Sequence, residues 1–444
     1  MKPSIPFLTS STETDLILTF ALIPLWNILG LNIFIYHAVI GWCFIKWLVS
    51  SRPVGGISMG IPKPLIWFAM FLCSYMLSIL INIQNQPEQR IFASVNNWLN
   101  FLMGFLVALT AYNLRSFSFV KRLLSAAAIV CAISSVAVIG GLILWFCGVK
   151  KLTFATIAGY YMPQLMDYPY FVGQLVMPFI QTDFALNNMP RISFFLGAKT
   201  ATGGFFVLMI PLLVGYYLSA KRNHKVQFTV LLVMSILAML LSLSRGAVLA
   251  LIGAFILVQI IDRGRNLHTS LFYLITSLFA ANSAIKIFSW MVNMRPSSTS
   301  TRMKLYEDAI RIAFENNILM GVGVKIREEF TMTAIGSHST HIGILLVSGI
   351  FGLCFFIAFE IAVFLYWYSL RNAWRDSPMR IIWKYLGASY IGMSIWIMTD
   401  GLDAFPYMIY VFFLVIAAIL MLKPLALEEE RSRAEAGEPV PLPS

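Results

Sequence analysis

The sequence has little charge for its length. Only 12% of its 444 residues are charged and 59% are hydrophobic, whereas soluble domains carry about 25% charged residues. Apolar stretches recur along the whole chain, and about 20 such residues in a helix cross a hydrocarbon layer roughly 30 Å thick. The runs are solidly apolar and lack the alternation of barrel strands. A soluble fold is therefore excluded, and the sequence predicts an all-α, polytopic transmembrane helical bundle.

Several patterns that carry chemistry are also missing. The five cysteines have no C-x-x-C spacing and fall in or beside apolar runs, so no disulfide framework or zinc site is expected. There is no G-x-x-x-x-G-K-[ST] loop for ATP and no internal repeat of the inverted-transporter kind. The net charge of +12 suits cytoplasmic loops and anionic lipid headgroups better than nucleic acid, because no basic patch is present.

The apolar runs predict twelve spans. They lie near residues 15–30, 32–49, 64–83, 91–112, 119–146, 200–219, 226–243, 246–261, 269–291, 342–368, 381–399 and 404–422. Lysines and arginines cluster in alternate connections between these spans. Because basic loops stay in the cytoplasm, the pattern predicts a multi-pass membrane protein with both termini cytoplasmic.

The soluble-looking sequence is concentrated in two long segments. With the transmembrane domain predicted over residues 1–424, segments 147–199 and 292–341 face the periplasm or the cell exterior, and residues 425–444 form a disordered cytoplasmic tail. Residues 301–316 place Met303, Tyr306, Ile310 and Ala313 at helical spacing. This spacing predicts an amphipathic helix, which either packs on the bundle or serves as a substrate lid.

Charged residues converge on the predicted periplasmic face. They are Arg191, Lys199, Arg245, Arg302 and His338. Guanidinium groups bind phosphate oxygens bidentately and stay charged, while an imidazole accepts a proton near neutral pH. The set therefore predicts an anion site with a base beside it, and a lipid-linked diphosphate is the obvious membrane-bound anion. The bland alternatives are interfacial anchoring for the arginines and a satisfied loop residue for the histidine.

Four further ionisable residues are less decisive. One helical turn would bring His341 beside His338, in a substrate-binding or structural role. Glu360 lies inside a predicted span, where it either hydrogen-bonds a neighbouring helix or couples to protons. Asp400 and Asp403 stand near the outer end of the last two spans. A metal site there is disfavoured, because no histidine or third acid accompanies them.

Short motifs follow one another in the second half of the chain. They are Arg191 with Ser193, the Ser242–Ala247 turn (SLSRGA), Arg302 with Tyr306, the Gly321-Val-Gly323 turn, and His338 followed by Gly349 and Gly352. Their order over roughly residues 190–355 resembles the O-antigen ligase and polymerase superfamily of bacterial envelope glycosyltransferases. The remainder of the chain agrees with that family only in hydropathy.

The resemblance implies a metal-independent inverting glycosyltransferase of the bacterial inner membrane, without a cofactor. It would move a glycan from undecaprenyl diphosphate to an acceptor sugar at the periplasmic face, with His338 as general base and Arg191, Arg245 and Arg302 binding the diphosphate. Lys199 and His341 join the expected substrate-binding set. The first choice is an O-antigen ligase that uses lipid A-core as acceptor. The alternatives are a polymerase that joins lipid-linked repeats and, from another class, a lipid-glycan or solute transporter.

Overall fold

The computed structural model describes residues 6–51, 60–164, 172, 174–183, 189–193, 199–219, 225–263, 296–327, 334–374, 377 and 379–435. Seven helices in these ranges are long and apolar enough to cross a membrane. They are α4 (Lys63–Asn82), α5 (Glu88–Leu114), α6 (Phe117–Phe146), α9 (Lys199–Ser219), α11 (Arg245–Arg263), α14 (Thr340–Ser369) and α16 (Pro406–Glu435). The predicted polytopic helical membrane fold is therefore confirmed.

The predicted count of twelve spans is not confirmed. Helices α1 (Pro6–Ala21) and α2 (Ile23–Leu29) form an eighth candidate, which is bent by 63°. Helices α3 (Ile35–Ser51) and α10 (Lys225–Leu241) are apolar but shorter, and α15 (Met379–Ile397) completes the bundle. The predicted span at 269–291 lies outside the described residues. Helix α16 continues to Glu435, so the first part of the predicted tail is helical.

The helix at the centre of the bundle is α16. In the apolar 18-residue stretch of α16, 83% is buried inside the bundle. The corresponding share is 78% in α9 but only 28% in α11. A helix that is hydrophobic on all sides belongs in an interior, and α16 has no polar stripe through its apolar part. The N-terminal end of this buried helix follows the turn at residues 400–405. That turn is consequently held fast at one end of the bundle.

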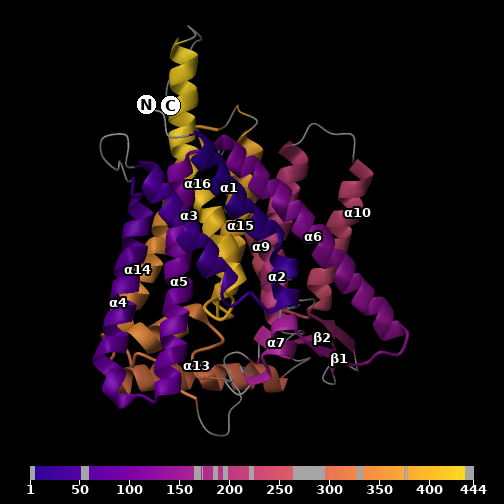
Figure 1. Cartoon of the computed structure of the whole chain (residues 1–444), viewed down its shortest axis with the longest axis vertical. Coiled ribbons are helices and arrows are strands. Elements are labelled where there is room, and N and C mark those ends of the chain that lie inside the picture. The colour runs from indigo at the N-terminus through magenta and orange to yellow at the C-terminus, as the bar shows by residue number, and fades with distance from the viewer. Residues whose placement is uncertain are drawn as a thin grey trace.

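Two elements close that same end. A three-stranded antiparallel sheet has the order β1 (Leu152–Ala155), β2 (Val176–Asp183), β3 (Met189–Ile192), and the sequence did not predict it. Helix α13 (Pro296–Asn316) lies across the ends of the spans. In Figure 1, α1 begins and α16 ends at the top, whereas the sheet and α13 lie at the bottom. The short helices η2 (Ile83–Asn85) and α7 (Ile157–Tyr161) also lie in connections.

Helix α13 confirms the predicted amphipathic helix but corrects its face. The buried seam is Leu305, Ala309 and Ala313, at spacings of four residues, and it packs on α14. Met303 and Ile310 are 53% and 39% exposed, so they do not belong to the packed face. The reason is that each residue advances about 100° around a helix axis. The predicted stripe and the buried seam therefore lie on faces of the helix that overlap only in part.

Candidate functional site

Helix α14 folds back on itself. His341 Nε2 lies 2.7 Å from Glu360 Oε2, although 19 residues separate them. In a straight helix with a rise of 1.5 Å per residue the two Cα atoms would be about 28 Å apart. The break is at Gly349, whose φ of 64° and ψ of −165° are not helical. Residues 340–348 therefore form a separate segment that returns toward the second half of the helix.

The turn at Gly321-Val-Gly323 supplies hydrogen-bond partners for the backbone at this break. Where the helix is interrupted, the carbonyls of Leu346 and Val347 accept from Val322 N and Gly323 N, both at 2.9 Å. On the other side of the break, Ile350 N donates to Ile318 O at 2.8 Å. Because buried backbone groups inside a membrane protein need partners, the turn makes the folded-back segment possible.

The two glycine motifs interlock at this point. Gly321 has a φ of 73°, and a Cβ on it would lie 2.5 Å from the Val347 carbonyl. A Cβ on Gly349 would overlap the backbone of Leu319. Neither position accepts a side chain, which explains physically why both motifs occur together. The consequence for the site is that residues 321–327 and 338–341 are fixed relative to each other.

His338 lies immediately before the folded-back segment. Its backbone carbonyl accepts from Tyr306 Oη of α13 at 2.8 Å, and Ser339 caps α14 by accepting from Ile342 N at 3.3 Å. Burial lowers the pKa of His338 to about 4, and the positive charges of Arg302 and Lys325 act in the same direction. The imidazole is therefore neutral at physiological pH and can accept a proton.

Arg191 reaches the site from the sheet. It stands on β3 opposite Gln181, and its Nε donates to the carbonyl of Ser242 at 3.0 Å. Burial lowers the pKa of Arg191 to about 10, helped by Arg302 and opposed by Asp400. The guanidinium nevertheless remains charged at neutral pH.

Arg245 opens α11 at the same place. Its Nη2 lies 3.4 Å from Thr299 Oγ1 of α13. The tight turn before it contains Leu243 with a φ of 53°, and Gly246 follows, where a Cβ would lie 2.5 Å from Thr399 Oγ1. The missing side chain lets the start of α11 approach the end of α15, which carries Arg245 to the arginine cluster.

Arg302 ties α13 to the turn after α15. Its Nη1 donates to the carbonyl of Thr399 at 3.0 Å, and its Nη2 lies 3.8 Å from Asp400 Oδ2. Asp400 is 5% exposed. Burial raises the pKa of Asp400 to about 6, against the opposing effects of Arg302, Thr200 and Arg191. One buried carboxylate thus serves as counter-ion within a group of arginines.

The structure brings four predicted residues to one place. Arg191, Arg245, Arg302 and His338 come from β3, α11, α13 and the approach to α14, and electrostatic interactions connect them. We call Arg191, Arg245 and Arg302 with Asp400 the arginine cluster. Its net charge is positive, as an anion site requires.

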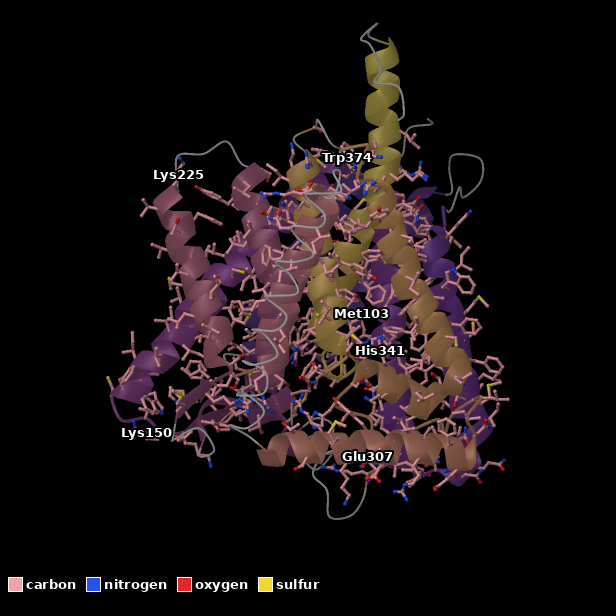
Figure 2. The ribbon with its side chains drawn as sticks, turned by 180° about the vertical axis from the view of Figure 1, so that it is seen from behind. Met103, Lys150, Lys225, Glu307, His341 and Trp374 are labelled. Carbon is pink, nitrogen blue, oxygen red and sulfur yellow. The ribbon has the colours of Figure 1, made fainter. Side chains whose placement is uncertain are left out.

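Two other predicted residues stand apart from this arrangement. The side chain of Lys199, the first residue of α9, lies outside the described side chains. His341 pairs with Glu360 across the fold in α14, and Figure 2 shows it inside the bundle, whereas Glu307 of α13 lies at the end of the bundle that this helix covers. From the sequence, Glu360 was expected either to hydrogen-bond a neighbouring helix or to couple to protons, and its partner His341 lies on the returning segment of the same helix.

Sequence reasoning missed two members of the site. It considered Asp400 only with Asp403 as metal ligands, but these carboxylates engage different cations: Arg302 for the first, and Lys325 at 2.6 Å for the second. Lys325 was not singled out at all. The predicted topology could have revealed Asp400 and Lys325, because the turn after span eleven and the segment before span ten were both predicted at the outer face.

Part of the chain is similar to a family of known proteins. Residues 230–357 match the family model described as O-antigen ligase. The matched segment includes Arg245, Arg302, His338 and both glycine motifs, whereas Arg191 precedes it. No curated protein matches the chain. The match confirms the resemblance that the motifs predicted: residues 230–357 of the chain are similar to the O-antigen ligase family.

Proposed function

We propose that this protein is a glycosyltransferase that moves a glycan from undecaprenyl diphosphate to an acceptor sugar. The observation that carries the proposal is the arginine cluster beside a neutral His338. The first choice of acceptor is lipid A-core, as in an O-antigen ligase. The family alone supports only activity of the ligase or polymerase type, so donor, acceptor and mechanism are parts of the proposal.

The charge of the cluster suits a diphosphate diester. Three guanidinium groups and the carboxylate of Asp400 leave two positive charges when Asp400 is ionised. A diphosphate esterified at both ends carries two negative charges, so its binding neutralises the group. Arginine is well suited to this task, because its planar guanidinium donates to two phosphate oxygens at once.

The proposed reaction is a single displacement. An oxygen of the acceptor forms a bond to the anomeric carbon while the bond from that carbon to the diphosphate oxygen breaks, which inverts the configuration. His338 takes the proton of the acceptor hydroxyl as general base. The departing diphosphate keeps the electron pair of the broken bond, and the arginines stabilise the charge that develops on it.

The position of the cluster fits a lipid-linked donor. Arg302 is on α13 and Arg191 is on β3 of the sheet, and these elements lie at the end of the bundle opposite the start of α1 and the end of α16 (Figure 1). With the termini cytoplasmic, this end would face the periplasm of a bacterial inner membrane. A polyprenyl chain would then stay in the bilayer while its diphosphate rests at the interface.

The test is transfer by a His338→Ala variant in membranes supplied with lipid-linked O-antigen and lipid A-core. General-base catalysis contributes about 10²- to 10⁴-fold, so the variant should lose at least about 100-fold in rate at unchanged protein level. Lys304→Ala, an exposed cation on α13, is the matched control and should keep full activity. Transfer by the His338 variant at more than a tenth of the normal rate would remove the histidine from this role.

Deleting the gene separates the competing functions. Lipid A-core without any polymer supports the ligase, whereas core that bears a single repeat supports the polymerase. Accumulation of lipid-linked glycan inside the cell would support transport instead.

A further inference from the structure

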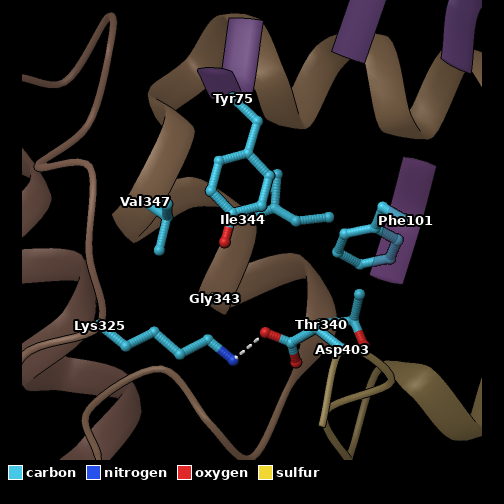
Figure 3. Close-up of a pocket in the computed structure, with 8 residues that line it drawn as sticks. All are labelled: Tyr75, Phe101, Lys325, Thr340, Gly343, Ile344, Val347 and Asp403. Atoms are coloured by element: carbon cyan, nitrogen blue, oxygen red, sulfur yellow. Dashed lines mark ion pairs between the residues drawn. The ribbon is translucent and has the colours of Figure 1, made fainter. Parts of the chain in front are cut away.

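A second polar site adjoins His338. Lys325, Asp403 and Thr340 supply the polar groups of a small pocket, and the rings of Tyr75 and Phe101 form part of its wall (Figure 3). The pocket encloses about 220 Å³ of empty space including its open side. Inside it there is room for a group about the size of a water molecule. It can therefore take a single hydroxyl but not a whole sugar ring.

A residue that lines the pocket has an unsatisfied carboxylate oxygen. Asp403 is 4% exposed. Its Oδ2 is 2.6 Å from Lys325 Nζ, but its Oδ1 has no hydrogen-bond partner among the described residues. A buried acceptor without a donor is costly. The carboxylate of Asp403 can therefore accept a further hydrogen bond.

Backbone contacts hold the ion pair in place. The carbonyl of Asp403 accepts from Asn100 Nδ2 at 2.9 Å. A Cβ on Gly343 would lie 3.2 Å from Lys325 Cε and 3.4 Å from its Nζ. Because Gly343 has no side chain, the Lys325 side chain can pack against the folded-back start of α14. This packing keeps its ammonium group beside the carboxylate of Asp403.

The turn at residues 400–403 divides two sites. Asp400 turns to Arg302, and Asp403 turns to Lys325. Between them, Thr340 lines the pocket and donates through its Oγ1 to the carbonyl of Asp400 at 3.0 Å. The charges of both Arg302 and Lys325 lower the pKa of His338. The histidine is accordingly shared by the arginine cluster and the pocket.

We propose that the Lys325–Asp403 pocket is the acceptor subsite, where it binds a hydroxyl group of the acceptor sugar next to the one that reacts. The proposal rests on the proposed function. In an inverting displacement the acceptor approaches from the side opposite the leaving diphosphate, and it must also reach the base. Thr340, which lines the pocket, is two residues after His338, and the turn at residues 400–403 lies between the pocket and the arginine cluster. A sugar hydroxyl donates to the Asp403 carboxylate and accepts from Lys325 Nζ, so one group bonds to both side chains.

The experiment measures how initial transfer rates depend on each substrate. Removing one charge leaves its buried partner unpaired and endangers folding, so the main variant is the double substitution Lys325→Met with Asp403→Asn, which removes both charges. Asp403→Asn alone is the second variant. Asp308→Asn is the matched control, because it breaks an ion pair of 2.7 Å with Arg311 on the outer surface of α13. Rough lipopolysaccharide is the acceptor, and lipid-linked O-antigen is the donor.

The expected result is a rise of about tenfold in the KM for rough lipopolysaccharide in the double variant, from the loss of hydrogen bonds to charged groups. The KM for the donor stays within twofold, and the control matches the wild type in both. An unchanged acceptor KM, or an equal rise in both KM values, overturns the subsite while wild-type transfer still supports the proposed function. Absence of transfer by the wild type overturns both.

Discussion

Occupation of the arginine cluster should change the basicity of His338. Two causes hold the pKa of His338 near 4: burial, and the charges of Arg302 and Lys325. The fall from 6.5 to about 4 corresponds to about 3 kcal/mol of additional free energy for protonating the ring. This is an upper value, because solvent screens a half-buried group.

A bound diphosphate cancels much of the electrostatic part. Its two negative charges offset the field of Arg302, so the pKa of His338 rises toward 6.5 in the complex while burial keeps it below that value. The donor would thereby turn a weak base into a stronger one at the moment when it is needed. Because proton transfer follows basicity, this change favours the displacement.

The assay is the pH dependence of transfer between pH 4 and pH 8 with purified protein. The profile of kcat/KM for the donor reports the free enzyme, and the profile of kcat reports the complex. We expect the acidic limb of kcat/KM near pH 4 and that of kcat at a higher pH. Coincident limbs, or a kcat/KM limb at 6.5 or above, would refute the coupling.

The same titration has a consequence for stability. The folded-state pKa of His338 is lower than the unfolded value, so the neutral ring contributes stability above pH 6.5, and this contribution is lost as the pH falls from 6.5 through about 4. Thermal unfolding at each pH should show this loss in the wild type. It should be smaller in a His338→Ala variant, which is the control for the kinetic profile.

Three further substitutions test individual parts of the site. Arg191→Lys should raise the donor KM about tenfold and leave the acceptor KM unchanged, because an ammonium group cannot bind phosphate oxygens bidentately. A donor KM equal to that of the wild type would place Arg191 outside the diphosphate site. Gly321→Ala should cost at least about 2 kcal/mol, from its positive φ and the contact with the Val347 carbonyl, and lower the Tm, whereas Gly41→Ala, with open space around it, should not. Glu360→Leu should cost about 1–3 kcal/mol by leaving His341 unpaired, and Glu360→Gln should retain most of the stability; similar Tm values for both would show that the pair contributes little.

The features predictable from the sequence are those that depend on local composition. Apolar runs long enough to cross a bilayer identify the class of fold wherever they occur. The motif around Arg245 and the glycine pairs near Arg302 and His338 led to the family, which residues 230–357 confirm. Placing the arginines at one face followed from alternating the loops, because each crossing reverses the side of the chain.

The face of α13 and the partners of Asp400 were not predictable in this way. Met303 and Leu305 both suit an apolar stripe by residue type, and only packing on α14 decides that the second is buried. Asp400 and Asp403 look equivalent in the sequence. Their different partners depend on how α13 and the segment at 321–327 reach the end of the bundle.

The sequence by itself determined that this protein is a helical membrane protein with cationic residues gathered at one face, since hydropathy and charge act locally and need no knowledge of long-range contacts. Only the tertiary structure decided that α14 breaks at Gly349 and returns, that the turn at Gly321 supplies the missing hydrogen bonds, and that Asp400 and Asp403 separate the arginine cluster from the pocket of Lys325. These are contacts between segments far apart in the chain. Backbone groups in a membrane must find partners wherever the fold provides them.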